Sequence, residues 1–409
     1  MTEKIAKPHL RFAGFDDTWE QRKVGELLIE RNEQAPMNEE YPLMAFIANE
    51  GVAPKGERYD RSSLVTDTEN KLYKRTEFGD FIYSSNNLET GSIGLNKYGK
   101  ACISPVYSIF HPTGIADSNF LGRRLVRKDF INSMVKWRQG VIYGQWRIHE
   151  SDFLKIEIPV PSVKEQRQIG TFLDYLDNLI TLHQRKYDKL TNVKKSMLEK
   201  MFPKNGSNVP EIRFKGFSDA WEQRKFDEVF DCTVPNNTLS RAELSYDEGT
   251  VLNVHYGDVL IKYGSVLDVQ KDDIPRIPHR CREDFNGALL QDGDVIIADT
   301  AEDETTGKAC EIGNLQGSAI VSGLHTMVCR PRNRMALGYL GYYLNSNAYH
   351  HQLLPLMQGI KVLSLSRSNI QKTSVSYPIA VKEQQLIAYY FSQLDHLITL
   401  HQCEYIFEK

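Results

Sequence analysis

The chain has 409 residues, of which 41% are hydrophobic and 25% are charged, and its formal net charge is −3. This composition is ordinary for a soluble globular protein with two or three domains. No apolar run is long enough to cross a bilayer, and the N-terminus lacks the apolar core of a signal peptide. The six cysteines form no Cys-x-x-Cys pair. Zinc and thioredoxin-type sites therefore have no support, and we expect reduced thiols in a cytoplasmic protein that contacts no membrane and binds no metal.

The sequence contains the same interval twice. Residues 8–23 and 210–225 are identical at 11 of 16 positions, and both blocks end in Trp-Glu-Gln-Arg-Lys. Residues 164–184 and 382–402 are identical at 12 of 21 positions without a gap. The stretches between these blocks show almost no likeness. A period of about 200 residues is too long for a solenoid. The repeat therefore indicates two whole domains in tandem, with one scaffold that presents two different recognition surfaces.

Each repeat ends in a segment with the pattern of a long helix. In the first repeat, Ser162 and Glu165 form a Ser-x-x-Glu capping box, and the helical pattern continues to about Met201, where Phe202-Pro203 ends it. Its apolar positions follow a heptad seam at Ile169, Phe172, Leu176, Leu179, Leu190, Val193 and Met197. About 40 helical residues span about 60 Å, which is too long to bury in a small domain. Such a helix needs a partner helix.

The second repeat supplies that partner. We expect the two helices to pack as an antiparallel coiled coil with an approximate two-fold axis. His183 and His401 occupy matching positions, and we interpret them as polar residues that fix the helix register, with a metal or catalytic role as the alternative. Ala380 replaces the capping serine, and Lys409 aligns with Thr191, so the second helix is expected to be shorter.

Short strand and helix patterns are mixed between the repeated blocks. Strands are expected at 79–83, 101–105 and 293–297, and helices at 128–138 and 336–351. The predicted fold class is therefore α+β. The predicted organisation is a first domain over 1–160, a central helix over 161–203, a linker and second domain over 204–378, and a terminal helix over 379–409. Trp19 and Trp221, in the repeated starts, are expected to be core anchors.

Charge is distributed in the same way in both intervals. Residues 24–89 carry a net charge of −6 and residues 90–150 carry +6. Residues 226–300 carry −9 and residues 305–372 carry +6. A basic half in each domain is the footprint expected for a polyanion such as DNA. The alternative, that the acidic and basic halves pair within each fold, remains open.

The sequence offers no convincing active site. Residues 303–308 end like a phosphate loop, but Glu302 stands where the first glycine is required. Asp294 and Asp299 suggest a nuclease carboxylate pair, but no Glu-x-Lys follows at a suitable spacing. The Gly-x-Gly-x-x-Gly, His-Glu-x-x-His and Gly-x-Ser-x-Gly patterns are absent, as is the Asn-Pro-Pro-aromatic motif of amino-methyltransferases. We therefore expect a chain without catalytic residues of its own.

Two paired motifs point to a family. The starts read Phe-x-Gly-Phe-x-x-x-Trp-Glu-Gln-Arg-Lys, and the helices begin Lys-Glu-Gln and continue with Leu-Asp-x-Leu-Ile-Thr-Leu-His-Gln. In this pairing and order, the whole chain resembles the specificity subunit of type I restriction–modification enzymes. The resemblance implies two target-recognition domains, each of which reads one half of a split sequence in double-stranded DNA. It also implies that the helices hold the two halves at a fixed spacing.

The resemblance further implies a non-enzymatic chain that binds no cofactor itself. Its expected partners are two modification (methyltransferase) subunits, which bind S-adenosylmethionine, and two restriction (motor-nuclease) subunits, which use ATP and magnesium. Two alternatives remain: a coiled-coil adaptor with two protein-binding domains, and a self-contained DNA-processing enzyme. Salt-dependent binding to duplex DNA would separate the leading interpretation from the adaptor.

For DNA binding, phosphate contacts are expected from Lys and Arg, and base contacts from Arg, Asn and Gln in the major groove. The candidate phosphate ligands are Arg123, Arg124, Arg127 and Lys128 in the first domain and Lys308, Arg330, Arg332 and Arg334 in the second. The candidate base-reading residues are Gln139, Tyr143, Gln145 and Arg147 in the first domain and Lys361, Ser364, Ser366, Arg367 and Asn369 in the second.

Overall fold

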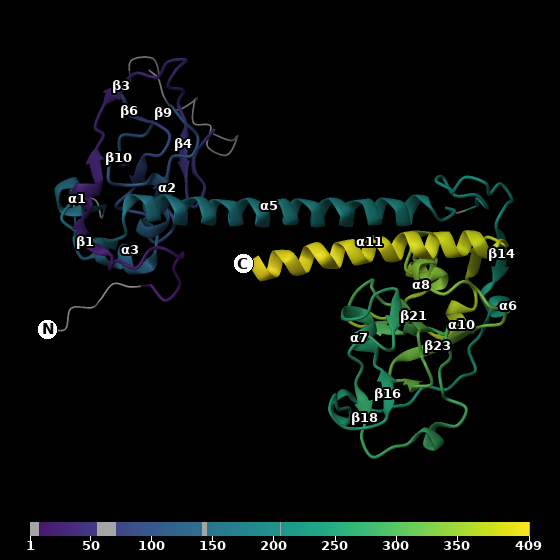
Figure 1. Ribbon diagram of the computed structural model, residues 1–409. Coiled ribbons are helices and arrows are strands. Elements are labelled where there is room, and N and C mark those ends of the chain that lie inside the picture. The colour runs from purple at the N-terminus through teal and green to yellow at the C-terminus, as the bar shows by residue number, and fades with distance from the viewer. Residues whose placement is uncertain (1–7, 55–70, 141–144, 205, 409) are drawn as a thin grey trace. The chain divides into compact units, whose positions relative to one another are not determined.

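The computed structural model describes residues 8–54, 71–140, 145–204 and 206–408, with side chains as far as Gln402. The chain divides into two compact units, residues 1–179 and 180–409, and the division falls inside the long helix α5, Val163–Lys200 (Figure 1). Both units combine helices with small sheets, so the fold class is α+β as predicted. Among the described residues, no helix has the length and apolar character that a bilayer span requires.

Unit 1 is made of short strands and short helices. Its strands are β1 Glu20–Lys23, β2 Leu28–Glu30, β3 Gln34–Ala35, β4 Ala45–Ile47, β5 Gly51–Ala53, β6 Tyr73–Thr76, β7 Phe81–Tyr83, β8 Ile93–Leu95, β9 Ala101–Ile103, β10 Ser108–Pro112, β11 Gln139–Gly140, β12 Trp146–Arg147 and β13 Glu157–Val160. Its helices are α1 Val24–Leu27, α2 Ser118–Leu125, α3 Lys128–Val135, α4 Glu150–Phe153 and the first part of α5. The largest sheet has the order β2-β10-β7-β8, and α2 packs against β7 and β8.

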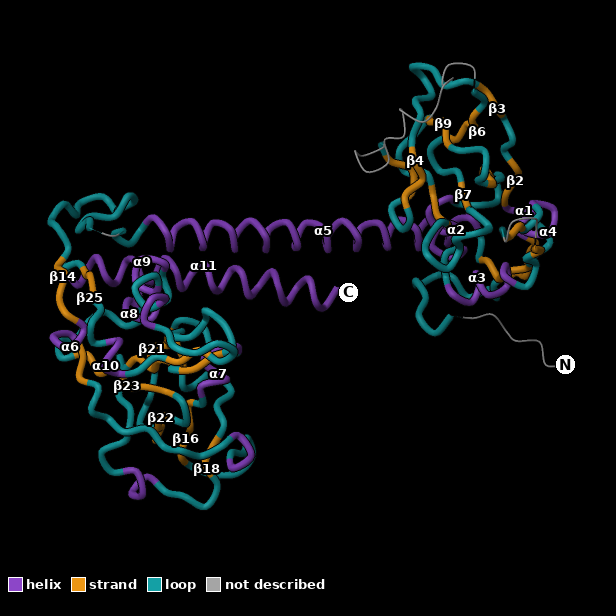
Figure 2. The backbone as a smooth tube through the Cα atoms, turned by 180° about the vertical axis from the view of Figure 1, so that it is seen from behind, coloured by secondary structure: helices purple, strands orange, loops and turns teal. Residues whose placement is uncertain are grey.

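Unit 2 has a larger sheet. Its strands are β14 Glu222–Lys225, β15 Phe230–Asp231, β16 Val251–Val254, β17 Val266–Asp268, β18 Arg276–Ile277, β19 Val295–Ala298, β20 Thr300–Ala301, β21 Ala309–Gly313, β22 Ala319–Ser322, β23 Thr326–Pro331, β24 Leu363–Ser364 and β25 Ser374–Tyr377. Its helices are α6 Phe226–Val229, α7 Tyr256–Ile261, α8 Tyr339–Leu344, α9 Asn347–His350, α10 Arg367–Ile370 and α11 Val381–Glu408, with 3-10 turns at Arg241–Glu243, Arg282–Phe285 and Leu354–Leu356. The main sheet has the order β15-β23-β19-β21-β17, and two of its strands, β21 and β23, are labelled in Figure 2.

The central strand β19 is buried on both faces of that sheet. Its sequence, Val-Ile-Ile-Ala, has no polar position, as expected for a strand covered on both sides. Val295 and Ile297 belong to the core beneath α8 and α11, whereas Ile296 and Ala298 belong to the core beneath α7. Because alternate side chains of a strand point to opposite faces, this one strand contributes to two hydrophobic cores of unit 2, one on each side of the sheet.

The repeated blocks form the same frame in both units. The Glu-Gln-Arg-Lys strand pairs antiparallel with the strand that precedes the long helix, as β1 with β13 and as β14 with β25. The Arg11 guanidinium holds the Glu165 carboxylate at 2.7 and 2.8 Å, and Arg213 holds Glu383 at the same two distances. Both glutamates are 1% exposed. In each unit, the repeated start binds the first turn of the long helix. This contact explains why both blocks of sequence are repeated.

The residue after each glutamate makes a second connection. The Gln166 side chain accepts a hydrogen bond from the Asp117 backbone N–H at 2.9 Å and donates to the Pro161 carbonyl. Gln384 accepts from the Ala336 N–H at 2.9 Å and donates to the Pro378 carbonyl. Each glutamine thus fixes its long helix to the segment that leads into α2 or α8.

The predicted capping box at the start of α5 is only half correct. The Glu165 N–H lies 3.4 Å from the Ser162 hydroxyl, as in a capping box. The Glu165 carboxylate, however, binds Arg11 in place of the Ser162 backbone. A bidentate bond to a guanidinium is stronger than a bond to a neutral N–H, so the distant arginine replaces the local contact.

Within unit 2, α11 lies antiparallel to the C-terminal part of α5 (Figures 1 and 2). The Nδ1 atoms of His183 and His401 lie 3.1 Å apart, which places equivalent residues of the repeat in contact, as at a two-fold axis. Leu190, Val193 and Met197 pack against the unit 2 core, in agreement with the predicted seam. Phe202, at the end of the helix, is fully buried against Trp221, Tyr343 and Phe391.

Several local predictions are confirmed and one is wrong. Strands β7, β9 and β19 and the helix α3 lie where the sequence predicts them. The single helix expected over 336–351 is instead two helices, α8 and α9. The break occurs because the Asn345 amide donates to the Ala309 carbonyl of β21 and the Ser346 hydroxyl donates to the Tyr343 carbonyl. Trp221 is 3% exposed, as a core anchor should be, and the half-buried Trp19 packs on Phe120.

Removal of Arg213 should destabilise unit 2. In Arg213→Ala, the buried Glu383 loses its bidentate partner, and we expect a loss of about 3 kcal/mol in the free energy of unfolding. Urea unfolding followed by circular dichroism measures this change. Arg224→Ala is the matched control, because Arg224 pairs with Glu222 at the surface of the same repeated block and its loss should leave the midpoint unchanged. Equal shifts in the two variants would contradict the role assigned to Arg213.

Candidate nucleic-acid interface

A two-stranded ribbon, β11 with β12, follows α3 in unit 1. Gln139 pairs with Arg147 and Gly140 pairs with Trp146. The base of this ribbon is fixed, because the Trp146 N–H donates to the Asn86 side chain at 2.6 Å and the Ile148 N–H donates to the Ser85 hydroxyl at 3.0 Å. Gln139, Gln145, Trp146 and Arg147 are all exposed. The candidate Tyr143 lies outside the described residues.

A second ribbon occupies the corresponding place in unit 2. Strands β20 and β24 pair through Thr300 with Ser364 and through Ala301 with Leu363. The loop before β24 is highly accessible: Ile360 is 100% exposed, and Lys361 is also exposed. In both units the second strand of the ribbon, β12 or β24, follows a Gln-Gly pair and precedes a one-turn helix, α4 or α10. The two segments that run from the Gln-Gly pair to the one-turn helix therefore correspond, although the first strand of the second ribbon, β20, comes from a distant part of the chain and its Ala301 is buried.

Three of the candidate base-reading residues of unit 2 have structural hydrogen bonds. The Ser364 hydroxyl donates to the Gln358 carbonyl at 3.3 Å. The Ser366 hydroxyl accepts from the Asn369 N–H and caps α10. The Asn369 amide donates to the Leu356 carbonyl at 3.1 Å. Lys361 and Arg367 are exposed, and no hydrogen bond of their side chains is seen among the described residues.

The candidate phosphate ligands of unit 1 divide into two kinds. Arg123 points to α5, where its guanidinium lies 2.6 Å from the carboxylates of both Asp174 and Asp177. Arg124 pairs with Asp129 at 3.0 Å and is mostly buried. Arg127 is 70% exposed and lies 3.3 Å from Asp129, and Lys128 is exposed. Arg127 and Lys128 are therefore the cations of this group that a phosphate can reach.

The candidate phosphate ligands of unit 2 also divide into residues with internal partners and exposed residues. Arg330 binds Asp294 through two bonds of 2.9 and 2.8 Å, and Asp294 is 1% exposed. Lys308 donates to the Leu260 carbonyl at 2.8 Å, and burial lowers the pKa of its ammonium group. Arg332 and Arg334 are exposed. Asp294 is thus explained as the partner of Arg330, in place of a nuclease carboxylate.

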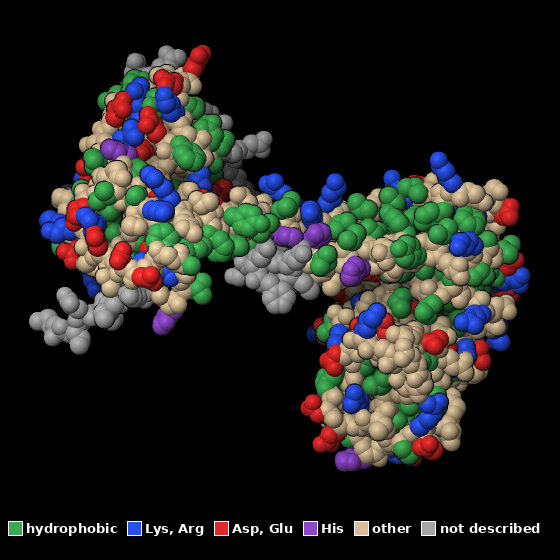
Figure 3. All heavy atoms as spheres, viewed as in Figure 1, with side chains coloured by type: hydrophobic (Ala, Val, Ile, Leu, Met, Phe, Trp, Pro, Cys, Tyr) green, Lys and Arg blue, Asp and Glu red, His purple; other side chains and the backbone are tan. Residues whose placement is uncertain are grey.

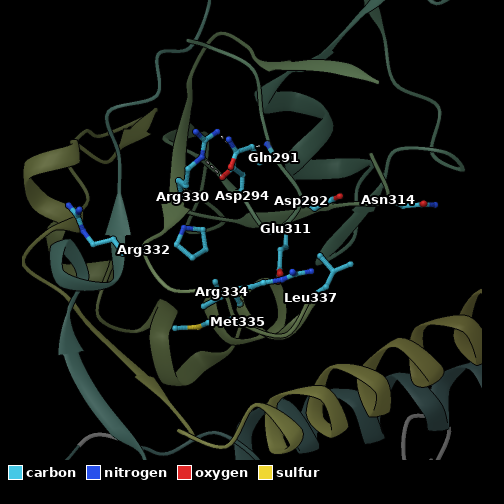
Figure 4. Close-up of a pocket in the computed structure, with 13 residues that line it drawn as sticks. Gln291, Asp292, Asp294, Glu311, Asn314, Arg330, Arg332, Arg334, Met335 and Leu337 are labelled. Carbon is cyan, nitrogen blue, oxygen red and sulfur yellow. Dashed lines mark hydrogen bonds and ion pairs between the residues drawn. The ribbon is translucent and has the colours of Figure 1, made fainter. Parts of the chain in front are cut away.

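Arg330, Arg332 and Arg334 border a pocket of about 580 Å³ at one end of the main sheet (Figure 4). Figure 4 shows Arg330 turned toward Asp294 and the Glu311 side chain among the lining residues. Glu311 accepts a hydrogen bond at 2.9 Å from the Gly341 N–H in the first turn of α8. Burial raises the pKa of Glu311 to about 7, although the hydrogen bonds from the helix start act in the opposite direction.

The structure places Arg330 away from the second ribbon. Arg330 lies near the end of β23, beside the start of β19, whereas the ribbon begins at Thr300, just after the end of β19. The four residues of β19 span about 13 Å. Arg330 and the β20–β24 ribbon are therefore at opposite ends of the sheet.

Sequence reasoning missed a polar group beside the second ribbon. His325 has a left-handed backbone (φ 54°), and its Nδ1 lies 3.4 Å from the Asp299 carboxylate and 3.4 Å from the Thr300 hydroxyl. Tyr256 packs edge-on against the His325 ring. A single sequence gives no reliable signal for a non-glycine residue with positive φ. The proximity of His325, Asp299 and Thr300 could therefore not be predicted from the sequence.

Part of the charge pattern is used inside the fold. Ion pairs join the acidic and basic halves of each interval, including Arg138 with Glu89 at 2.7 Å and Arg330 with Asp294. Within the described ranges, no group of three His, Cys, Asp or Glu side chains could hold a metal ion. The exposed polar side chains that remain include Gln139, Gln145 and Arg147 on the first ribbon and Lys361 and Arg367 on either side of β24 in unit 2. Side chains of these types can contact the edge of a base pair and its phosphates.

Comparisons with known proteins follow the internal repeat. A family model described as "Type I restriction modification DNA specificity domain" matches residues 16–192 and again residues 218–406. The specificity subunit of the type I restriction enzyme MjaVIII from Methanocaldococcus jannaschii is 22% identical over 407 residues, which cover 95% of this chain and 88% of that protein.

The solved structures that are similar to this chain include two crystal structures. The S subunit of a type I restriction–modification system from M. genitalium has a TM-score of 0.50 and 13% identity, with coverage of 97% of this chain and 94% of that one. The HsdS subunit from Thermoanaerobacter tengcongensis has a TM-score of 0.43 and 17% identity, with coverage of 98% and 96%. The similarity to the M. genitalium subunit shows a common fold.

The buried Glu311 should make the stability of unit 2 depend on pH. Its pKa rises from an ordinary 4.5 to about 7 on folding, so its favourable contribution is complete below pH 4.5 and is lost as the pH rises through about 7. We expect the free energy of unfolding to fall by on the order of 3 kcal/mol across this interval. Glu311→Gln keeps an acceptor oxygen for Gly341 and should flatten the profile measured by urea unfolding between pH 5 and pH 8.

The control for this measurement is Glu302→Gln, which changes an exposed carboxylate of the same unit. Its pH profile should match that of the original protein. An unchanged slope in Glu311→Gln would show that another group causes the pH dependence.

Proposed function

Because the chain belongs to the type I restriction–modification DNA specificity family, we propose that it selects a two-part DNA sequence for a type I methyltransferase and restriction complex, with one unit reading each half. The family consists of specificity subunits that are not themselves catalytic. The observation that carries the proposal is the double match, since each repeat of the frame carries one specificity domain with its own insert.

The two ribbons are the proposed base-reading elements. A two-stranded ribbon fits the major groove of B-DNA, where bidentate Arg, Asn and Gln contacts discriminate base pairs. In unit 1 the proposed readers are Gln139, Gln145 and Arg147, which are exposed on a ribbon with a fixed base. In unit 2 they are Lys361, in the loop before β24, and Arg367, the first residue of α10, so that the readers lie on either side of the second strand of the ribbon. Arg127 and Lys128 in unit 1 are the proposed phosphate contacts.

The long helices are the proposed scaffold for the partner subunits. Large apolar side chains are exposed along them: Phe172, Tyr175 and Leu182 on α5, and Tyr389, Leu397 and Leu400 on α11 are each at least 40% exposed. Hydrophobic side chains also gather over the helix pair of unit 2 in Figure 3. Exposed apolar surface of this kind is typical of a protein interface. We assign it to modification subunits, expected as two copies.

The chemistry belongs to the partners under this proposal. The modification subunits would bind S-adenosylmethionine and methylate adenine, and two restriction subunits would use ATP and magnesium. The role of this chain is to bind DNA and to position those subunits.

A coiled-coil adaptor with two protein-binding domains is the second candidate. It is favoured by the internal use of Arg123, Arg138 and Arg330, which leaves fewer free cations than the sequence suggests. An adaptor would bind duplex DNA weakly and without a strong salt dependence. A specificity subunit assembled with its partner should lose affinity steeply as salt rises.

Methylation mapping tests the proposal directly. We expect co-expression of this chain with its modification subunit, in a host without adenine methylation, to produce methyl-adenine at a two-part motif with a constant spacer. Exchange of residues 24–160 for those of a related chain should alter only one half of the motif. A soluble complex without any methylation would contradict the proposal, and failure to form a complex would favour the adaptor.

Arg147→Ala should lower affinity for the specific duplex by about 1–3 kcal/mol and leave binding to a random duplex unchanged, if Arg147 contacts a guanine. The matched control is Lys128→Ala, which should weaken both duplexes equally and reduce the slope of log affinity against log salt by about 1. Fluorescence anisotropy of the assembled complex measures both effects. Equal loss on the two duplexes in Arg147→Ala would reject base reading by this residue.

A further inference from the structure

Two cysteines of unit 2 meet inside the protein. Cys232 follows β15, Cys329 lies within β23, and their Sγ atoms are 3.6 Å apart in hydrogen-bonding contact. Cys232 is 8% exposed and Cys329 is 1% exposed. The two residues are 97 positions apart in the sequence, so their proximity is a property of the fold alone.

The strand register places these residues directly opposite each other. Phe230 pairs with Pro331 and Asp231 pairs with Arg330, so the next position of the ladder sets Cys232 against Cys329. The Arg332 N–H donates to the Val229 carbonyl at 2.8 Å. Because hydrogen-bonded and non-hydrogen-bonded pairs alternate, the cysteines occupy a non-hydrogen-bonded position, where Cα atoms are about 4.5 Å apart. A disulfide requires a Cα separation of about 4.4–6.8 Å.

The surroundings make the two thiols unequal. The hydrogen bond shared with Cys329 lowers the pKa of Cys232, and the positive charges of Arg367 and Arg332 act in the same direction against the effect of burial. The shared hydrogen bond and burial raise the pKa of Cys329 well above its ordinary value. A more accessible, thiolate-forming sulfur next to a buried thiol is the arrangement of an attacking and a resolving cysteine.

The pair is specific to one of the two inserts. In unit 1, strands β2 and β10 occupy the corresponding place, and there Glu30 lies opposite Phe110. The frame common to both units therefore does not need two cysteines at this position. The remaining thiols of known position are separate: Cys281 is exposed, and Cys102 and Cys310 are buried elsewhere.

We propose that Cys232 and Cys329 form a reversible disulfide when the protein meets a peroxide, which links β15 to β23 in unit 2. The Cys232 thiolate attacks one peroxide oxygen, and the other oxygen leaves as hydroxide and is protonated to water. The resulting sulfenic acid is attacked by the Cys329 sulfur, the S–S bond forms, and the hydroxyl group leaves as water with the Cys329 proton. The two thiols together lose two electrons, and the peroxide is reduced to two molecules of water. A thiol reductant reverses the bond by exchange.

The test uses the full-length protein and limiting hydrogen peroxide. After denaturation and maleimide labelling, the number of reactive thiols should fall from six to four per chain. A non-reduced peptide map should contain one linked pair, Cys232 with Cys329, and dithiothreitol should restore all six thiols. The oxidised protein should also unfold at higher urea concentration, because the bond closes a long loop in the unfolded chain.

Cys281→Ser is the matched control, since it removes an exposed thiol and should still form the link, with five reactive thiols falling to three. Cys232→Ser and Cys329→Ser should each abolish it. If either of these variants folds poorly, the peptide map of the original protein still decides the question. Cys232 found as an unlinked sulfinic acid, or a linked pair that contains Cys281, would overturn the proposal.

Discussion

The bidentate ion pair between an arginine of the repeated start and the first glutamate of the long helix is the contact on which each unit depends. A carboxylate buried to 1% exposure is unfavourable by several kcal/mol unless a charged partner satisfies it. Arg11 and Arg213 meet that requirement, and they do so from segments 154 and 170 positions away from their partners. The two ends of each interval are thereby held together, and the insert between them is free to differ.

The same frame explains why one helix serves both units. At its start, α5 is fixed to unit 1 by Glu165 and Gln166, and at its end Phe202 is part of the core of unit 2. Between these points His183 meets its own repeat equivalent, His401. A hydrogen bond between two identical side chains on antiparallel helices is lost when either helix shifts by one turn, so this pair defines a single register.

Elements with a strong local pattern could be predicted from the sequence, and contacts between distant segments could not. The long helix has a hydrophobic periodicity, and the strands around Phe81, Ala101 and Val295 have a composition, that can be recognised from the local sequence alone. The bond of the Glu165 carboxylate to Arg11, in place of the Ser162 backbone, and the division of α8 from α9 depend on partners far away in the chain. The repeat itself was visible, but the reason for it, a buried ion pair, required the fold.

The candidate interface shows the same division. Residue type and net charge made all eight arginine and lysine candidates equivalent, but the fold separates them by what each already binds. Arg123 and Arg330 are neutralised by Asp177 and Asp294, whereas Lys128 remains accessible. Internal ion pairs therefore remove much of the apparent positive charge, and under the proposed function discrimination between DNA sequences comes from the exposed hydrogen-bonding side chains on the first ribbon and beside the second. Because the ribbons lie in the inserts and not in the frame, a change of insert would alter the sequence that is read without disturbing the ion pairs that hold each unit together.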